Sequence, residues 1–281
     1  NTTFTVNALP TAAITANGTT TFCQGANVTL TASTGTSYLW STGATTASIV
    51  ASTSGNYVVT VTNANGCSAV SVPMMVTVNP LPVAAITANG PTTFCQGGNV
   101  TLVASTGTSY VWSNGAITQS ITVSTAGTYS VIVTNSDGCS ATSASTTVTV
   151  NALPTPTITA SGATTFCQGS TVTLTSSAGT AYLWSSGETT QSIIANVDGP
   201  YSVTVTNASG CTATSANTNL VVYPLPTVAA ITGPNAVCEG STVVLATTTT
   251  GGTWSSSNTL AATISSTGVV AGVAAGNAVL T

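Results

Sequence analysis

The chain contains no lysine, no arginine and no histidine among its 281 residues, and it has only four carboxylates. Soluble domains are commonly about 25% charged, so a chain of this length would be expected to carry about 70 charged residues. Nucleic-acid binding requires cations that neutralise phosphates, and a basic membrane-surface patch requires the same side chains. The composition therefore excludes nucleic acid as a partner, and it excludes binding to a membrane surface through a basic patch.

The missing side chains also remove most catalytic chemistry, because histidine and lysine supply the usual general bases, Schiff-base amines and imidazole metal ligands. Asp137 and Asp198 each precede a glycine, and we interpret them as turn residues and not as ligands of Ca²⁺, which collects several carboxylates. Glu188 and Glu239 have no counterparts in the other repeats described below, and we expect them to be solvated. We predict no catalytic residue, no cofactor and no metal, and hence no enzyme.

Long apolar runs are absent as well. The hydrophobic fraction is 42% and the mean hydropathy +0.45, yet the longest apolar runs, such as 72–76, fall far short of the roughly 18 residues of a membrane-spanning helix. We therefore expect no direct membrane insertion. The abundant threonine favours strands. Residues 1–10 lack the basic start and apolar core of a secretion signal, so an exported protein would carry its signal upstream.

An internal repeat of about 72 residues organises the chain. Cys23, Cys95, Cys167 and Cys238 are separated by 72, 72 and 71 residues, and one tryptophan follows each of them at a similar interval. Connectors containing proline, such as 79–82, join the repeats and are predicted to be extended and semi-rigid. We divide the chain into the last strand of a preceding repeat (1–9), repeat 1 (10–80), repeat 2 (81–152), repeat 3 (153–224) and a partial repeat 4 (225–281).

Both ends of the chain are expected to be cut within a repeat. Residues 2–10 match 146–154, which form the end of repeat 2, and repeat 4 lacks a second cysteine, which leaves seven cysteines in all. We favour a segment of a longer chain. The alternative is that the orphan strand at one end completes the partial domain of a neighbouring molecule, as in donor-strand pairing, although this arrangement would leave Cys238 unpaired.

Repeat 2 illustrates the predicted fold. Alternation of apolar and polar residues in 99–105 is typical of a strand with one buried face, and Asn114-Gly115 is a hairpin signal. About seven short strands are predicted in about 70 residues, which indicates a small antiparallel β-sandwich. The other predicted strands are 83–87, 109–113, 117–123, 128–134 and a last strand ending near Val150.

The positions of the aromatic residues indicate that the predicted sandwich is immunoglobulin-like. Such folds place a core tryptophan on the third strand and a tyrosine corner near the start of the sixth. The residues that we assign to this core signature are Trp40, Trp112, Trp184, Trp254, Tyr57, Tyr129 and Tyr201. The pairs Tyr38/Trp40, Tyr110/Trp112 and Tyr182/Trp184 could instead form a platform for stacking on sugars, but we favour the core because both members of each pair lie on one face.

The cysteines are predicted to form one disulfide in each complete repeat. A spacing of 44 residues recurs between Cys23 and Cys67, between Cys95 and Cys139, and between Cys167 and Cys211, which leaves Cys238 unpaired. Closing such a loop is worth about 4 kcal/mol in the loop-entropy model. Two thiolates without histidine cannot complete a zinc site. Disulfides predict an oxidising, extracytoplasmic location.

The recurring pattern Thr-Phe-Cys-Gln-Gly, Tyr-x-Trp-Ser-x-Gly and Gly-x-Tyr-x-Val-x-Val-Thr-Asn-x-x-Gly-Cys resembles the Ig-like or PKD-like repeats of giant surface proteins of Bacteroidota. Repeat 4, with its Thr253–Asn258 and Ile264–Gly276 segments, resembles bacterial Ig-like group 2 domains. The resemblance implies export by the type IX secretion system and display on the cell surface with attachment to the outer membrane, as in SprB-like adhesins of gliding motility.

Together these observations predict a non-enzymatic structural or adhesive stalk at the cell surface, a fragment of a giant repeat adhesin. Its expected partners are the secretion or motility machinery or surface glycans, and the low charge allows self-association. The alternatives are a carbohydrate-binding accessory module and a self-assembling extracellular filament subunit.

Overall fold

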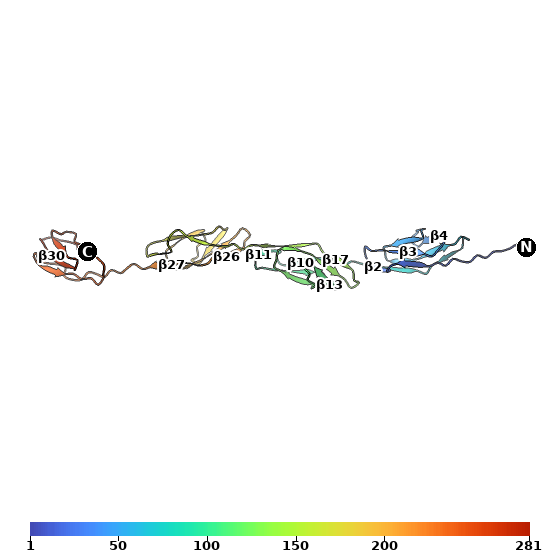
Figure 1. Cartoon of the computed structure of the whole chain (residues 1–281), viewed down its shortest axis with the longest axis horizontal. Coiled ribbons are helices and arrows are strands. Elements are labelled where there is room, and N and C mark those ends of the chain that lie inside the picture. Colours follow the sequence, from blue (N-terminus) through green and yellow to red (C-terminus); the bar gives the residue numbers. More distant parts are fainter. The chain divides into compact units, whose positions relative to one another are not determined.

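A computed structural model describes all 281 residues and shows an all-β chain (Figure 1). No helix in it is long and apolar enough to cross a membrane. The chain forms two compact units. The first comprises Asn1–Thr155, Gly179–Ala181 and Val205–Ala213, and the second comprises Pro156–Ala178, Tyr182–Thr204 and Thr214–Thr281.

Repeat 2, in the green part of Figure 1, shows the architecture of one bead, our name for the folded part of a repeat. One sheet has the order β10-β12-β14, and the facing strands have the orders β13-β16-β17 and β11-β18-β15. The strands are β10 (Ile86–Asn89), β11 (Thr93–Cys95), β12 (Val100–Ala104), β13 (Ser109–Trp112), β14 (Ser120–Val123), β15 (Gly127–Tyr129), β16 (Val131–Thr134), β17 (Ser140–Thr142) and β18 (Thr146–Asn151).

Two pairs of these short strands are single strands interrupted by a bulge. The predicted strand 128–134 is divided at Ser130 into β15 and β16, and the next strand is divided into β17 and β18. At the interruption Val131 N donates to Ser143 Oγ, and Ser143 N donates to Val131 O. With each pair counted once, the bead has seven strands in two layers, which is an Ig-like sandwich.

Repeats 1 and 3 contain the same strands in the same order. In repeat 1 they are β1 (Ile14–Asn17), β2 (Thr21–Cys23), β3 (Val28–Ala32), β4 (Ser37–Trp40), β5 (Ser48–Ala51), β6 (Gly55–Tyr57), β7 (Val59–Thr62), β8 (Ser68–Val70) and β9 (Met74–Asn79). In repeat 3 they are β19 (Ile158–Ala160), β20 (Thr165–Cys167), β21 (Val172–Ser176), β22 (Ala181–Trp184), β23 (Ser192–Ala195), β24 (Gly199–Tyr201), β25 (Val203–Thr206), β26 (Thr212–Thr214) and β27 (Thr218–Tyr223).

The core of each bead lies between the two layers. In repeat 2 the alternation predicted for 99–105 is confirmed, because Val100, Leu102 and Ala104 of β12 are all buried. They pack with Trp112 of β13 and with Val131 of β16. The strand ends differ from the prediction by up to three residues, since the hydrophobic pattern marks the buried face better than it marks the ends of the backbone ladder.

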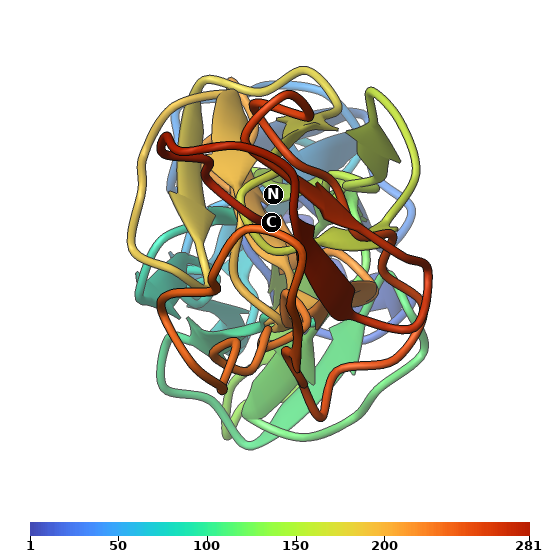
Figure 2. The same cartoon turned by 90° about the vertical axis from the view of Figure 1, so that its left-hand side faces the viewer.

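Repeat 4, shown in orange to dark red in Figure 2, has fewer strands. Its sheet has the order β28-β30-β29, built from β28 (Thr242–Val244), β29 (Ala262–Ile264) and β30 (Val269–Gly272). Only Ala261 and Val270 are buried hydrophobic residues there, and Trp254 is half-buried. This repeat therefore has a much smaller core than repeats 1 and 2.

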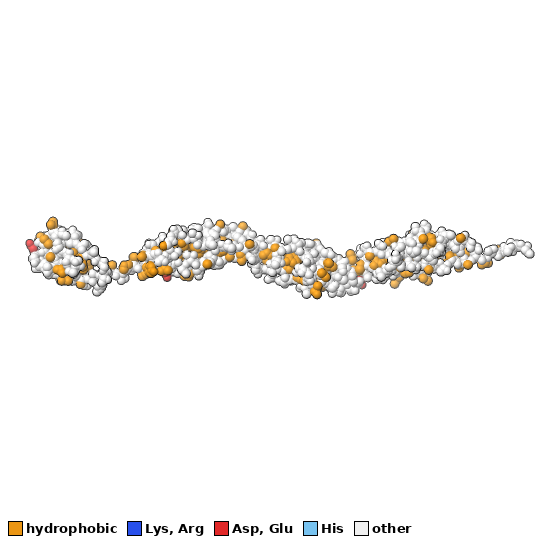
Figure 3. Space-filling model, viewed as in Figure 1, with side chains coloured by type: hydrophobic (Ala, Val, Ile, Leu, Met, Phe, Trp, Pro, Cys, Tyr) orange, Lys and Arg blue, Asp and Glu red, His pale blue; other side chains and the backbone are white.

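The visible surface carries almost no charge. In Figure 3 most of the surface is polar and uncharged or backbone, with scattered apolar side chains and a few carboxylates. Hydrogen bonds between hydroxyl groups on neighbouring strands, such as Thr134 with Ser140 and Thr31 with Ser48, occupy positions where many proteins place ion pairs.

Candidate functional site: a disulfide clasp between repeats

The aromatic signature belongs to the core in the three complete repeats. Trp40, Trp112 and Trp184 are each only 2% exposed, and their indole Nε1 atoms donate to Thr46 O, Thr118 O and Thr190 O at 2.8 Å. The core interpretation of these tryptophans is therefore confirmed, and they cannot form a sugar-stacking platform.

The tyrosines form the expected corner. The hydroxyl groups of Tyr57 and Tyr129 each donate to the carbonyl oxygen four residues upstream at 3.0 Å, and Tyr201 makes the same bond at 3.3 Å. This bond connects the tyrosine side chain to the loop that precedes β6, β15 or β24. The arrangement is the tyrosine corner of Ig-like folds.

No group of three possible metal ligands occurs among the carboxylates and cysteines of the chain. Asp198 accepts a hydrogen bond from Val222 N. At the equivalent position of repeat 1, Ser54 Oγ accepts the same bond from Val78 N. The place of Asp198 in the bead is therefore that of a backbone acceptor.

The predicted disulfide pairing within repeats is wrong. Cys23 is bonded to Cys139, and Cys95 to Cys211, each over a sequence separation of 116 residues and with a Cα–Cα distance of 5.6 Å. The first cysteine of one repeat thus joins the second cysteine of the next repeat. Cys67, Cys167 and Cys238 are free, so the chain has two disulfides and not one in each complete repeat.

The two cysteines of one bead cannot meet because they lie at opposite ends of the last strand. Cys95 of β11 pairs in register with Asn151, the last residue of β18, whereas Cys139 directly precedes β17. The chain from Cys139 to Asn151, twelve residue steps through β17 and β18, is largely extended and spans roughly 40 Å at about 3.3 Å per residue. A disulfide requires Cα atoms within about 7 Å.

We call each disulfide between successive repeats a clasp, and each clasp lies at the end of a bead. In repeat 1, β2 runs parallel to β9 and brings Cys23 opposite Asn79, the residue that precedes the Pro80–Pro82 connector. Gln24 N donates to Asn79 O at 2.8 Å. Cys139 Sγ lies 4.0 Å from the same oxygen, so the disulfide closes directly over the start of the connector.

An asparagine in the second bead holds the connector in place. Asn135 Nδ2 donates to Pro80 O at 2.9 Å, while Asn135 Oδ1 accepts bonds from Asp137 N and Cys139 N. One side chain therefore fixes both the turn that presents Cys139 and the connector beside it. Asn207 repeats every one of these bonds, with Ala152 O, Ser209 N and Cys211 N as its partners.

Sequence reasoning missed this asparagine, although a signal for it was present. The motif Asn-x-x-Gly-Cys recurs at 63–67, 135–139 and 207–211. An asparagine placed two and four residues before backbone N–H groups is typical of an Asx turn. The contact of its amide with the preceding connector depends on the arrangement of two repeats, which the pattern within one repeat does not contain.

The two disulfides overlap in sequence and produce a closed covalent ring. Cys23 and Cys95 are 72 residues apart, as are Cys139 and Cys211. With the bonds 23–139 and 95–211, two separate covalent routes of equal length connect Cys23 to Cys211. This duplication is the most distinctive chemical feature of the chain.

No family model and no curated protein matches the sequence. Similar solved structures include a 1.5-MDa bacterial ice-binding adhesin studied for host cell surface retention, with 18% identity, a TM-score of 0.31, and coverage of 76% of this chain and 98% of that one. The N-terminal eight Ig domains of Down syndrome cell adhesion molecule are 15% identical with a TM-score of 0.29, and the match covers 94% of this chain and 50% of that one.

A third similar structure is the SGBP-B protein of the Bacteroides ovatus mixed-linkage glucan utilization locus, in complex with a mixed-linkage heptasaccharide. It is 16% identical with a TM-score of 0.21, and the match covers 82% of this chain and 72% of that one. At these identities the likeness concerns the fold alone.

Proposed function

We propose that the chain is a non-enzymatic structural and adhesive stalk of an extracellular, cell-surface protein, built from Ig-like beads that are covalently locked to their neighbours. The observation that carries this proposal is the overlap of the two disulfides. A ligand-binding module needs a formed site, whereas a covalent connection from each bead to the next serves the transmission of force and resistance to breakage.

The overlap protects the continuity of the stalk against cleavage. A single backbone cut anywhere between Cys23 and Cys211 leaves at least one of the two covalent routes intact. Disulfides confined to single repeats would leave every connector as a point of failure. An exposed surface protein meets proteases, and the absence of lysine and arginine removes the sites of trypsin-like enzymes as well.

A site-specific cut tests this function. A protease recognition sequence is inserted at Val72-Pro73, in the exposed interruption between β8 and β9 where Val72 is 80% exposed, since exposed segments outside the strand ladders tolerate insertion. After cleavage the oxidised protein should remain in one piece, and it should separate into two fragments only after reduction.

The matched control carries the same insertion at the exposed Gly251-Gly252, beyond Cys211. Cleavage at this position should release a fragment without reduction, which verifies that the assay detects separation. If the Val72-Pro73 cut also separates the chain without reduction, the disulfides do not join successive repeats and the proposed role of the clasp fails.

The location follows from the same bonds, because disulfides persist outside the reducing cytoplasm. We extend the proposal to export by a type IX secretion system, attachment at the outer membrane and a role in gliding motility or surface attachment, on the basis of the sequence resemblance alone. Deletion of the secretion system in the source organism should then remove the protein from the cell surface, as detected by antibody labelling of intact cells.

A carbohydrate-binding module is the second candidate. Because Trp40, Trp112 and Trp184 are buried, glycan recognition would have to use surface hydroxyl groups or an exposed aromatic side chain such as Tyr223. Binding of the chain to a glycan array that is lost on Tyr223→Ala would favour this function. A filament subunit is the third candidate, since the low net charge of −4 weakens repulsion between copies.

A further inference from the structure

Bead 2, the folded part of repeat 2, is joined to bead 1 at one end by two covalent attachments that lie next to each other. One is the connector that starts after Asn79, and the other is the disulfide from Cys23 to Cys139. Cys139 Sγ lies 4.0 Å from Asn79 O. A pull on bead 1 therefore reaches bead 2 through both attachments at the same end.

The opposite end of bead 2 has the same pair of attachments to repeat 3. The connector starts after Asn151, which lies opposite Cys95 in the register of β11 and β18, and Cys95 is bonded to Cys211. Cys211 Sγ lies 4.0 Å from Asn151 O. Tension that leaves bead 2 therefore also passes through a backbone joint and a disulfide joint at one place.

The segment from Cys139 to Asn151 is a nearly fully extended covalent link between these two ends. Its twelve residue steps reach at most about 43 Å, and β17 and β18 already span roughly 40 Å. The segment can therefore lengthen by only a few ångströms, even when every hydrogen bond of bead 2 is lost. Residues 96–138, which contain most of the buried core, lie outside this route.

We propose that the clasps form a mechanical bypass, in which tension runs from Cys23 across the disulfide to Cys139 and then along β17 and β18 to Asn151. Bead 2 then keeps its length under load whether or not its core is folded. The stalk thereby gains a further mechanical function, that of a tether that keeps its length when one bead unfolds. The inference deepens the proposed function, because it states how the stalk carries force, and it rests on that function.

A bead without clasps behaves differently under tension. Its repeat of 72 residues extends to roughly 260 Å when unfolded, which is about 220 Å more than the folded bead spans. Tension shifts a folding equilibrium in proportion to the length that unfolding releases. Because the bypass reduces this length from about 220 Å to a few ångströms, tension hardly favours the unfolding of bead 2.

The second disulfide supplies a separate and slightly longer bypass. From Asn79 the backbone reaches Cys95 in 16 residue steps, at most about 58 Å, and the route continues through the disulfide to Cys211. Loss of the Cys23–Cys139 disulfide alone would thus allow bead 2 to lengthen by roughly 20 Å. Loss of the Cys95–Cys211 disulfide alone would leave the shorter route through β17 and β18 in place.

Stretching single molecules of the complete chain between its ends tests the bypass. Leu102→Ala removes a fully buried side chain from the core of bead 2 and makes this bead the first to unfold. Hydrogen exchange identifies the urea concentration at which β12 is unprotected while β3 and β21 remain protected, and Val133→Ala is added where Leu102→Ala leaves β12 protected. Val111→Ala, at an exposed position of β13 in the same bead, is the matched control.

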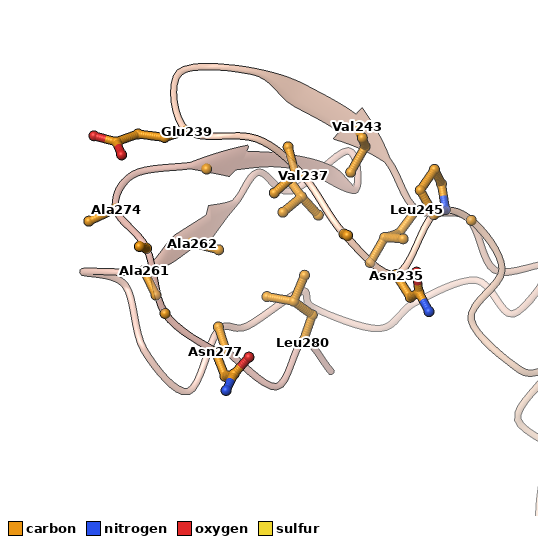
Figure 4. A pocket seen from close by; sticks show the side chains of 18 of the residues that line it. Asn235, Val237, Glu239, Val243, Leu245, Ala261, Ala262, Ala274, Asn277 and Leu280 are labelled. Atoms are coloured by element: carbon orange, nitrogen blue, oxygen red, sulfur yellow. The ribbon is translucent and has the colours of Figure 1, made fainter.

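Repeat 4 gives a reference for these measurements, because it lies outside the ring that the two clasps form. It contains a cavity of about 610 Å³ that is lined in part by Val237, Val243 and Leu245 (Figure 4), and a cavity among apolar side chains weakens packing. Any lengthening that comes from repeat 4 should be the same in all the chains compared.

The expected contour lengths form a series. In the oxidised chain, the Leu102→Ala variant should stay within about 10 Å of the original chain, as should the control variant. Adding Cys23→Ser and Cys139→Ser should lengthen the core variant by roughly 20 Å, whereas adding Cys95→Ser and Cys211→Ser instead should leave its length unchanged. With all four serines it should be at least about 200 Å longer than the original chain.

Peptide mapping of the same samples separates failure of the bypass from failure of the proposed function. If both clasps are present and oxidised Leu102→Ala still exceeds the original chain by more than about 10 Å, the bypass is wrong, while a stalk of covalently joined beads stands. The bypass is also wrong if the chain with four serines does not lengthen. Disulfides within single repeats would refute the clasp and the proposed function together.

Discussion

At the scale of single residues, the glycine before each third strand is required by a close approach of the backbone. A Cβ atom at Gly107 would overlap Val133 Cγ1 and would lie 2.9 Å from Thr134 O, and Gly35 and Gly179 stand in the same relation to Val61 and Val205. Val133 is fully buried. The side chain therefore has no free space into which it can move.

Gly107→Ala should destabilise repeat 2 by about 1 to 3 kcal/mol, because overpacking of a close-packed core displaces side chains and backbone. Hydrogen exchange of the β16 amides, measured by mass spectrometry, reports the local free energy. Gly127→Ala in the same repeat is the control, since its Cβ would meet Tyr129 at an ordinary 3.6 Å; protection there should stay within about 0.5 kcal/mol. Equal effects of the two variants would contradict the packing account.

At the scale of elements, the strands were more predictable than their connections. The alternation around Leu102 and the position of Trp112 identify buried faces directly, because a side-chain period of two is a local property. The division of 128–134 at Ser130 was not predicted, since the bulge depends on the partner strand that carries Ser143. The disulfide pairing failed for a related reason: equal spacing within a repeat does not reveal that Cys95 and Cys139 lie at opposite ends of the last strand.

The turn that carries Cys139 offers a test of the clasp. Asn135→Asp keeps an acceptor for Asp137 N and Cys139 N but loses the donor to Pro80 O. Loss of one hydrogen bond, worth about 0.5 to 1.5 kcal/mol, should loosen the connector over the buried Cys139 and speed reduction of the Cys23–Cys139 disulfide roughly 2- to 10-fold.

The Cys95–Cys211 disulfide is an internal control in this experiment, because Asn207 retains its bonds. Mass spectrometry of alkylated peptides during reduction follows both bonds in one sample. Unchanged reduction of Cys23–Cys139, or equal acceleration of both disulfides, would show that Asn135 does not protect the clasp.

At the scale of the whole molecule, the missing charge and the overlapping disulfides complement one another. A chain without lysine and arginine has no ion pairs between side chains, so its beads depend on buried cores, backbone ladders and covalent bonds. The aromatic core and the Ig-like class could be predicted from one repeat. The covalent ring could not, because it exists only when two successive repeats are considered together.

The pairing of the cysteines is the central claim, and peptide mapping of the oxidised chain tests it most directly. Digestion with pepsin at acidic pH suppresses disulfide exchange, because exchange requires the thiolate, and it does not need the basic residues that the chain lacks. The account predicts linked peptides that join Cys23 to Cys139 and Cys95 to Cys211. Peptides that join Cys23 to Cys67 and Cys95 to Cys139 would contradict it.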